Sequence, residues 1–281
     1  MTGNVSWRFT ATATSHTLVV VQVVDRTVIW AAGGGFTEGD GSVVRSVDGG
    51  RHWSRVTPPG GASPAFRDVH AVDANRALVL TMGSAARIYR TVDGGASWRE
   101  TFANTDPAAF YDGMAFFDRR RGVAVSDAVD TTIPIQITGD GGRSWARVPA
   151  GGVAAGLPQE GPFATGTSLV AIGKRDALFV TTVPEHHPRV FRTRDGGLTW
   201  TVADTPIPRP GLRSVAFRNR HDGLGVGGTP PTEGTDGVGS AARTEDGGRT
   251  WQVTGAPTGF RNSVAWLSGR RAVAVGTPAA T

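Results

Sequence analysis

The sequence predicts an all-β protein, a β-propeller of four-stranded antiparallel blades, and two observations carry this prediction. First, an eight-residue motif occurs five times: Ser or Thr, any residue, Asp-Gly-Gly, two further residues and Trp, at residues 46–53, 91–98, 138–145, 193–200 and 244–251. Second, the tryptophans of this DGG–Trp motif follow one another at intervals of 45, 47, 55 and 51 residues. Repeats of about 40 to 50 residues are typical of four-stranded propeller blades. No stretch combines a sustained helical period with capping residues, so we expect almost no helix.

Within each repeat, short runs of β-branched, aromatic and small residues return in the same order, bounded by Gly, Pro, Asn and Asp, as strands are. We expect the first run to form the innermost strand of a blade and the second, rich in Val, Ala and Gly, to pair with it. A third run leads into the motif, and a fourth begins at its Trp. The first runs are residues 69–72, 114–117, 215–217 and 264–267; the second are 77–81, 122–125, 223–227 and 271–276; the third are 87–90, 133–137 and 190–192.

The residues of the motif suit a turn clamp. Gly adopts positive φ without steric cost, as tight turns require. The carboxylate of Asp and the hydroxyl of Ser or Thr can accept the N–H groups of the turn, and the Trp ring buries a large apolar face. Five catalytic or metal sites would use the same atoms, but the motif returns in every repeat and active sites seldom do. We therefore interpret these residues as structural: Asp48, Trp53, Asp93, Trp98, Asp140, Trp145, Asp195, Trp200, Asp246 and Trp251.

The repeats predict a single domain over residues 1–281, with blade boundaries near the tryptophans Trp7, Trp53, Trp98, Trp145, Trp200 and Trp251. Residues 6–8 are similar to residues 97–99, so we expect Trp7 to end an incomplete motif. After the last motif the chain offers only a first and a second run. Two arrangements fit: a six-bladed ring with a short final blade, or a truncated seven-bladed ring, which we favour.

The pattern of a Val-, Ala- and Gly-rich second run followed by a DGG–Trp motif resembles the Asp-box (BNR) repeat propellers, and within them the Ycf48-like family of photosystem II assembly factors. The residues that carry the resemblance are the five motifs together with Ala32-Gly33, Val125 and Ala274-Val275-Gly276. The resemblance implies a binding or assembly factor. Bacterial members often carry the label oxidoreductase, but no residue here indicates redox chemistry. Asp-box repeats also occur in sialidases and other glycosidases.

Composition excludes several function classes. The chain has no Cys, which excludes disulfides, a thiolate nucleophile and Cys-based metal sites. The six His show no metal-ligand spacing, and we predict no metal and no cofactor. The net charge of +5 comes almost wholly from scattered Arg, without a basic run or an aromatic platform, so we expect no nucleic-acid partner. No membrane span and no secretory signal are visible, and we expect a cytoplasmic protein.

Polar residues that differ between the repeats follow an apolar residue where each first run begins. They are Arg67, Asp68, Tyr111, Asp112, Arg213, Ser214, Arg261 and Asn262, and the fourth repeat has residues 163–166 at this place. Innermost strands line the central channel of a propeller, so we expect these side chains to converge at its mouth. Convergent polar groups at a concave opening indicate a binding site. The alternative is a set of strand caps and channel-lining ion pairs.

Two functions follow for such a mouth. We favour a non-catalytic binding or assembly propeller that holds a protein segment or a small anionic or glycan ligand, in an oligomeric state that the sequence leaves open. The alternative is a sialidase-like glycoside hydrolase, with Arg67, Arg213 and Arg261 as a carboxylate clamp. Its catalytic candidates are Asp68, Tyr111, Asp112 and Glu160. The sialidase Phe/Tyr-Arg-Ile-Pro sequence is absent, and we lean against an enzyme.

Overall fold

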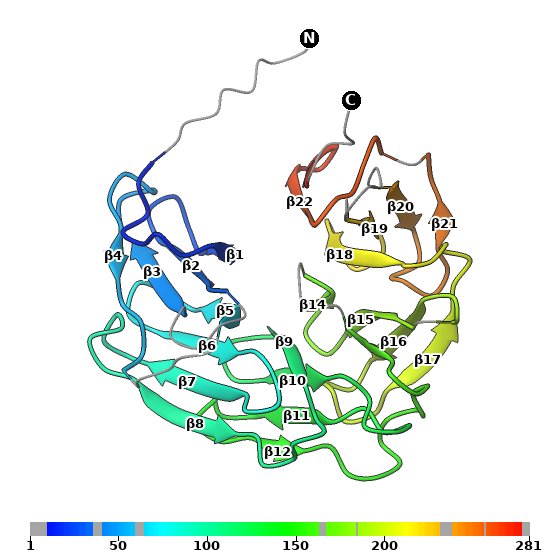
Figure 1. Ribbon diagram of the computed structural model, residues 1–281, viewed down its shortest axis with the longest axis horizontal. Coiled ribbons are helices and arrows are strands. Elements are labelled where there is room, and N and C mark those ends of the chain that lie inside the picture. Colours follow the sequence, from blue (N-terminus) through cyan, green and yellow to red (C-terminus); the bar gives the residue numbers. More distant parts are fainter. Residues whose placement is uncertain are drawn as a thin grey trace. The chain divides into compact units, whose positions relative to one another are not determined.

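The computed structural model describes residues 10–35, 41–59, 65–162, 167–183, 185–230, 238–255 and 257–276. All regular structure in these ranges is β, in 23 strands without a helix (Figure 1). Five antiparallel blades of a β-propeller follow one another along the chain, as the motif spacing predicted. None of the described segments forms a helix that could span a membrane. Trp7, predicted to end an incomplete motif, lies outside the described residues.

The chain divides into two compact units, residues 1–79 with 89–99 and residues 80–88 with 100–281. The first blade contains β1 (Leu18–Val23), β2 (Ile29–Gly33), β3 (Ser42–Ser46) and β4 (Ser54–Arg55). The second contains β5 (Phe66–Ala71), β6 (Ala77–Thr81), β7 (Arg87–Thr91) and β8 (Arg99–Ala103). In both blades the strands pair in sequence order.

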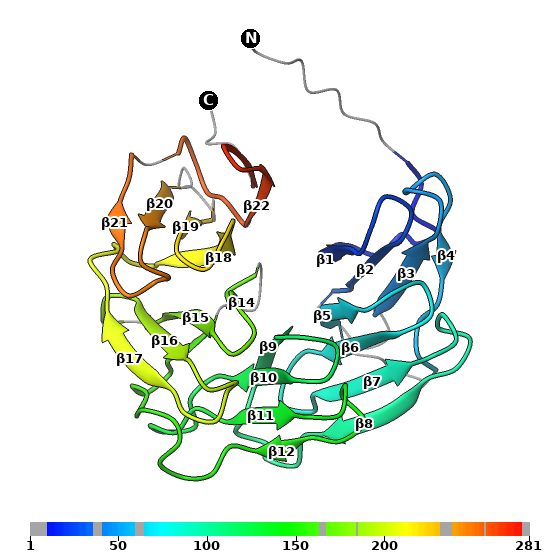
Figure 2. The same cartoon turned by 180° about the vertical axis from the view of Figure 1, so that it is seen from behind.

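The second blade is divided between the two units, and the third to fifth blades belong to the second unit. Figure 2 shows their strands from behind. The third contains β9 (Tyr111–Phe116), β10 (Gly122–Ser126), β11 (Ile135–Thr138) and β12 (Ala146–Arg147). In the fourth, β13 (Gly161–Pro162) and β14 (Leu169–Ala171) both pair with β15 (Ala177–Thr182), and β16 (Arg189–Thr193) and β17 (Thr201–Asp204) follow. The fifth contains β18 (Leu212–Phe217), β19 (Gly223–Thr229), β20 (Val238–Thr244) and β21 (Gln252–Val253). A two-stranded sheet of β22 (Ser263–Ser268) and β23 (Arg271–Val275) comes last.

The first strand of three blades begins earlier than the apolar runs predicted. β5, β9 and β18 start at Phe66, Tyr111 and Leu212, three residues before the predicted starts at residues 69, 114 and 215. The polar residues in between therefore lie within the strands and not in a loop before them, and Asp112 and Arg213 fall where the pairing register shifts, at a β-bulge. The strand extends to these polar residues because the apolar residue before them belongs to the core. Phe66 precedes Arg67 and Leu212 precedes Arg213, and both apolar side chains are fully buried.

The DGG–Trp motif forms a closed hydrogen-bonded turn. In the third blade, the carboxylate of Asp140 accepts hydrogen bonds from Thr138 Oγ1 (2.9 Å), from the backbone N–H groups of Arg143 (2.9 Å) and Ser144 (3.0 Å), and from Ser144 Oγ (2.7 Å). Thr138 Oγ1 in turn accepts the N–H of Gly142 at 3.0 Å. These contacts hold the pKa of Asp140 at about 2, below its usual value.

The same turn is built in the other four motifs. Both glycines of every motif have φ between 72° and 95°, the left-handed region that favours Gly. In the first motif His52 takes the place of the second hydroxyl, and its Nδ1 lies 2.6 Å from Asp48 Oδ2. The indole N–H groups vary more: Trp53 and Trp200 donate to the carbonyl three residues back, whereas Trp98 donates to Val56 of the preceding blade.

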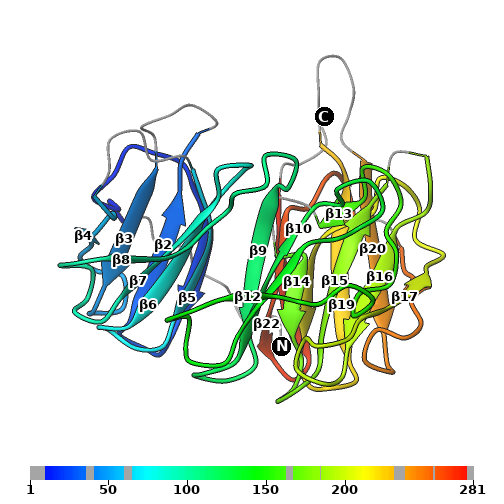
Figure 3. The same cartoon turned by 90° about the horizontal axis from the view of Figure 1, so that it is seen from below.

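Neighbouring blades of the second unit are held by an apolar core between their faces. In the fourth blade the rings of Phe179 and Phe191 stack at 4.8 Å, and Trp200 of the motif lies 5.2 Å from Phe179. Val123 of β10 and Ile135 of β11 belong to the same buried cluster, so the third and fourth blades share it. Figure 3 shows the strands β14 to β17 of the fourth blade side by side.

Replacing Asp140 by Ala removes the acceptor of four hydrogen bonds in one turn. We expect the free energy of unfolding to fall by on the order of 2 kcal/mol, because several N–H and O–H groups lose a charged partner. Urea denaturation measures this change. The matched control is Asp204→Ala at the exposed end of β17, for which we expect a change within about 0.5 kcal/mol. An equal loss of unfolding free energy in Asp140→Ala and Asp204→Ala would contradict the role of Asp140 in closing the turn.

Candidate functional site

The structure places the predicted polar residues in the first strands or directly before them. Arg67 and Asp68 lie in β5 of the first unit, and the other six belong to the second unit: Tyr111 and Asp112 in β9, Arg213 and Ser214 in β18, and Arg261 and Asn262 before β22. Several are buried in spite of their polarity, since Arg67, Asp112 and Arg213 are each 6% exposed. Charged side chains are rarely buried without a specific reason. Residues 163–166, the fourth predicted group, lie outside the described residues.

Arg213 is positioned by the segment that leads into β22. Its guanidinium carbon lies 5.5 Å from the centre of the Phe260 ring, a cation–π contact. Burial lowers the pKa of Arg213 to about 10. Next to it, the buried hydroxyl of Ser214 accepts the N–H of Val264 at 3.2 Å. The start of β18 and the start of β22 are thus joined by polar and aromatic contacts.

Arg261, the residue after Phe260, is bonded to its own turn. Its guanidinium donates to the carbonyls of Phe260 and Thr258, both at 2.9 Å. Its backbone N–H donates to Gly227 in β19 at 3.2 Å, and the N–H of Asn262 donates to Val275 in β23 at 2.8 Å. Arg213 and Arg261 therefore lie on neighbouring elements. The structure gives Arg261 the role of holding the turn before β22.

Tyr111, a candidate nucleophile, has its hydroxyl in a contact within its own blade. Gln136 Nε2 donates to the Tyr111 hydroxyl at 2.7 Å, and the ring of Tyr111 meets Phe102 edge to face at 5.2 Å. The residue is 1% exposed, and this burial raises the pKa of the phenol. An ionised nucleophile is disfavoured in such an environment.

Glu160, the acid proposed beside Tyr111, links the segment before β13 to the strands β15 and β16 of the fourth blade. It is fully buried, forms an ion pair with Arg189, and accepts hydrogen bonds from Thr181 Oγ1 (2.7 Å) and the N–H of Leu157 (2.8 Å). Arg189 Nε donates to the same carboxylate at 3.0 Å. These contacts give Glu160 a structural role at the start of β13.

Asp127 is a residue that the sequence interpretation missed. It follows β10 directly, and its carboxyl group is hydrogen-bonded to that of Asp112. Burial raises the pKa of Asp127 to about 6. Gly161 of β13 gives the carboxyl group its space, since a Cβ there would lie 1.5 Å from Asp127 Oδ1. The available signal was an acidic residue that follows the Val- and Ala-rich second run of its repeat.

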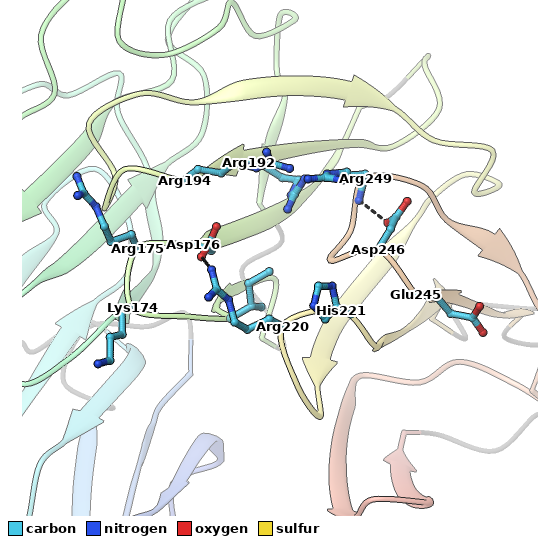
Figure 4. A pocket seen from close by; sticks show the side chains of 11 residues that line it. Lys174, Arg175, Asp176, Arg192, Arg194, Arg220, His221, Glu245, Asp246 and Arg249 are labelled. Carbon is cyan, nitrogen blue, oxygen red and sulfur yellow. Dashed lines mark hydrogen bonds and ion pairs between the residues drawn. The ribbon is translucent and has the colours of Figure 1, made fainter.

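A second feature that sequence reasoning missed is a cleft of about 800 Å³ between the fourth and fifth blades (Figure 4). It lies at the turns that carry the DGG–Trp motifs. Six basic side chains line it against three acidic ones. The lining residues are Ile172, Lys174, Arg175, Asp176, Arg192, Arg194, Arg220, His221, Glu245, Asp246 and Arg249. Among the described residues no three His, Cys, Asp or Glu side chains are grouped as a metal site would require.

Four-stranded blades, each closed by a DGG–Trp turn, place the chain in the class of β-propellers. Solved structures of this kind are similar to it over most of its length. Ycf48 bound to D1 peptide matches at 16% identity and a TM-score of 0.50, covering 95% of this chain and 91% of that one. YCF48 from Cyanidioschyzon merolae matches at 17% identity and a TM-score of 0.55, covering 90% of this chain and 77% of that one.

A glycoside hydrolase is similar as well. The GH74 xyloglucanase from Xanthomonas campestris matches at 16% identity and a TM-score of 0.57, covering 92% of this chain but 43% of that one. The chain thus spans less than half the length of that enzyme. No protein-family model and no curated protein matches the chain. At these identities the likeness shows the propeller fold, and the function has to be argued from the site itself.

The raised pKa of Asp127 should make the free energy of unfolding depend on pH. The folded-state pKa of about 6 lies above the value of about 4 in an unfolded chain. Between these values the folded protein holds a proton that the unfolded chain has lost, so the free energy of unfolding falls as pH rises through this window. Asp127→Asn removes the titrating group but keeps a hydrogen-bonding partner for Asp112.

Urea denaturation of the wild type and of Asp127→Asn across this window measures the effect. The difference between the two proteins reports the titration of the Asp112–Asp127 pair, separately from the carboxyl groups of the motifs, whose pKa values are lowered. We expect the wild type to lose stability relative to the variant as pH rises. A difference that stays constant with pH would contradict the assignment.

Proposed function

We propose that this chain is a binding propeller that holds a protein segment through the polar residues of its first strands. The observation that carries the proposal is the buried cation of Arg213, set on Phe260 at the start of β18. Burying a charged side chain costs free energy, and neither the blade repeat nor the DGG–Trp motif requires an Arg at this position. A guanidinium held in place before a ligand arrives suits an acidic side chain or a peptide carboxylate.

Differences between blades support a binding role for the first strands. The residues that close the turns are nearly the same in all five motifs, whereas the polar pair at the start of the strand changes from Arg-Asp to Tyr-Asp to Arg-Ser. A structural requirement common to all blades would select the same residues. The fold is also known to serve peptide binding, since one of the similar solved structures is Ycf48 bound to D1 peptide.

A peptide selection tests this function. The protein is immobilised and panned against a phage-displayed library, enriched peptides are synthesised, and fluorescence anisotropy measures their Kd. We expect Kd to rise about tenfold or more in Arg213→Gln and in the triple variant Arg67/Arg213/Arg261→Ala, because a charged contact is lost. The control is Arg143→Gln, an exposed motif residue.

Thermal denaturation of each variant shows that it is folded before binding is compared. If no peptide is enriched, or if the first-strand variants bind as well as the wild type, the proposal is wrong. Loss of binding in Arg143→Gln as well would place the peptide elsewhere on the molecule.

Glycoside hydrolysis is the second candidate function, and the pair of Asp112 and Asp127 is the observation that favours it. Burial raises the pKa of Asp127 above that of an ordinary Asp, and a general acid needs a raised pKa of this kind. The geometry argues against this function, because the two carboxyl groups are directly hydrogen-bonded. Glycosidases hold theirs about 5 to 9.5 Å apart, with the sugar or a water between them.

Fluorogenic sialosides and β-glucosides test the second candidate. We expect release of the fluorophore at the rate of the uncatalysed reaction, in the wild type and in Asp127→Asn alike. Turnover by the wild type that is lost in Asp127→Asn but kept in Asp204→Ala would establish a hydrolase and overturn the ranking.

A further inference from the structure

The cleft between the fourth and fifth blades lies apart from the first strands and carries an unusual concentration of positive charge. Three of its arginines come from motif turns: Arg192 directly before the motif of the fourth blade, Arg194 inside it, and Arg249 inside the motif of the fifth. They follow one wall of the cleft in Figure 4. The same three also line an adjoining cavity of about 400 Å³, so they separate two hollows.

These arginines repel one another. The pKa of Arg192, which is half-buried, is lowered first by burial and then by the charges of Arg194 and Arg249. Within the described part of the chain, no carboxylate lies within ion-pair distance of any of the three guanidinium groups. Like charges brought together in this way are unfavourable, unless an anion neutralises them.

The acidic residues of the cleft have other partners. Asp176 forms an ion pair with Arg220. Asp246 is the carboxylate of the motif clamp, bonded to Thr250 Oγ1 at 2.7 Å and to the N–H of Arg249 at 2.9 Å. Glu245 is exposed and lies 3.6 Å from Arg243, which does not line the cleft. Asp176 and Asp246 therefore offset the charge of Arg192 only in part, through space, and none of the three acids forms an ion pair with Arg192, Arg194 or Arg249.

A comparison within the molecule shows what is special about this cleft. Arg45 holds the position of Arg192 in the first blade, directly before the motif. It donates to the carbonyl of Ala74 in the next blade at 2.7 Å and so serves as a structural tie. Arg192 makes no side-chain hydrogen bond to any described residue. The buried Nε lacks a partner in both arginines, so the two differ in their terminal nitrogens, of which Arg45 uses Nη1 for Ala74. The same repeat position thus links two blades in the case of Arg45, whereas the guanidinium of Arg192 has donors that no described residue uses.

We propose that this cleft binds a small phosphate or sulfate monoester, with the oxyanion between Arg192, Arg194 and Arg249. A tetrahedral oxyanion offers three terminal oxygens, enough to meet guanidinium groups that come from two blades, whereas a carboxylate offers two. The volume of the cleft is that of a site for a small organic molecule and exceeds the need of an inorganic ion. All lining residues except Ile172 are polar. A polar lining suits a ligand whose organic part carries hydroxyl groups, such as a sugar.

Isothermal titration calorimetry of the full chain tests the proposal with four probes: glucose 6-phosphate, glucose 6-sulfate, glucuronate and inorganic phosphate. We expect the two monoesters to bind more tightly than glucuronate, because glucuronate has no tetrahedral oxyanion. We also expect them to bind more tightly than inorganic phosphate, because inorganic phosphate has no sugar. Binding should weaken as salt rises, because it neutralises exposed charge.

Matched variants locate the site. We expect Arg249→Gln to raise the Kd of glucose 6-phosphate by about tenfold. The double variant Arg192/Arg249→Gln is expected to raise this Kd further. The control is Arg143→Gln, the same motif position in the third blade. Arg249 is exposed, so its single variant should keep the thermal stability of the wild type.

Three outcomes would overturn the inference: no heat of binding from either monoester, equal affinity for glucuronate or inorganic phosphate, or equal weakening in Arg143→Gln. The peptide assay of the first strands is independent of this site. A chain that binds peptide but no monoester loses only the present inference, and one that binds monoester but no peptide loses only the proposed function.

Discussion

The structure depends on one constraint, the closure of each motif turn around an ionised Asp. Two consecutive glycines in the left-handed region turn the chain, and this conformation leaves several N–H groups pointing inward. A single carboxylate collects them, as Asp140 does, together with the hydroxyls of Thr138 and Ser144. The turn sets where the third strand of a blade ends and the fourth begins, and so it fixes the pairing of these two strands in each blade.

Most of the fold could be predicted from the sequence because the motif acts locally. All of its atoms lie within eight residues, so the carboxylate, the hydroxyls and the glycines could be assigned roles without knowledge of the rest. The starts of the first strands were predicted too late because Arg67, Asp112 and Arg213 are charged. Only tertiary contacts, such as the ring of Phe260 under Arg213, make such residues suitable for a buried strand.

The candidate sites were less predictable, for a related reason. The partnership of Asp112 and Asp127 depends on the space that Gly161 of another blade leaves open. Arg194 and Arg249 come from the motifs of two blades and Arg192 from the end of β16, and along the chain none of the three stands out. Their meeting is a property of blade packing. The repeats did indicate where to look, because positions that differ between copies stand out against positions that do not.

Ten glycines of the motifs share one property, a backbone conformation that disfavours every residue with an L side chain. At these positions nearly every change of amino acid carries a cost, so evolution has little freedom there. The hydrogen bonds to the carboxylate of each turn are made within its own motif, so the five turns do not share donors or acceptors with one another. Substitutions at the polar positions that differ between the repeats do not touch these turns, so they leave this framework of turns unchanged.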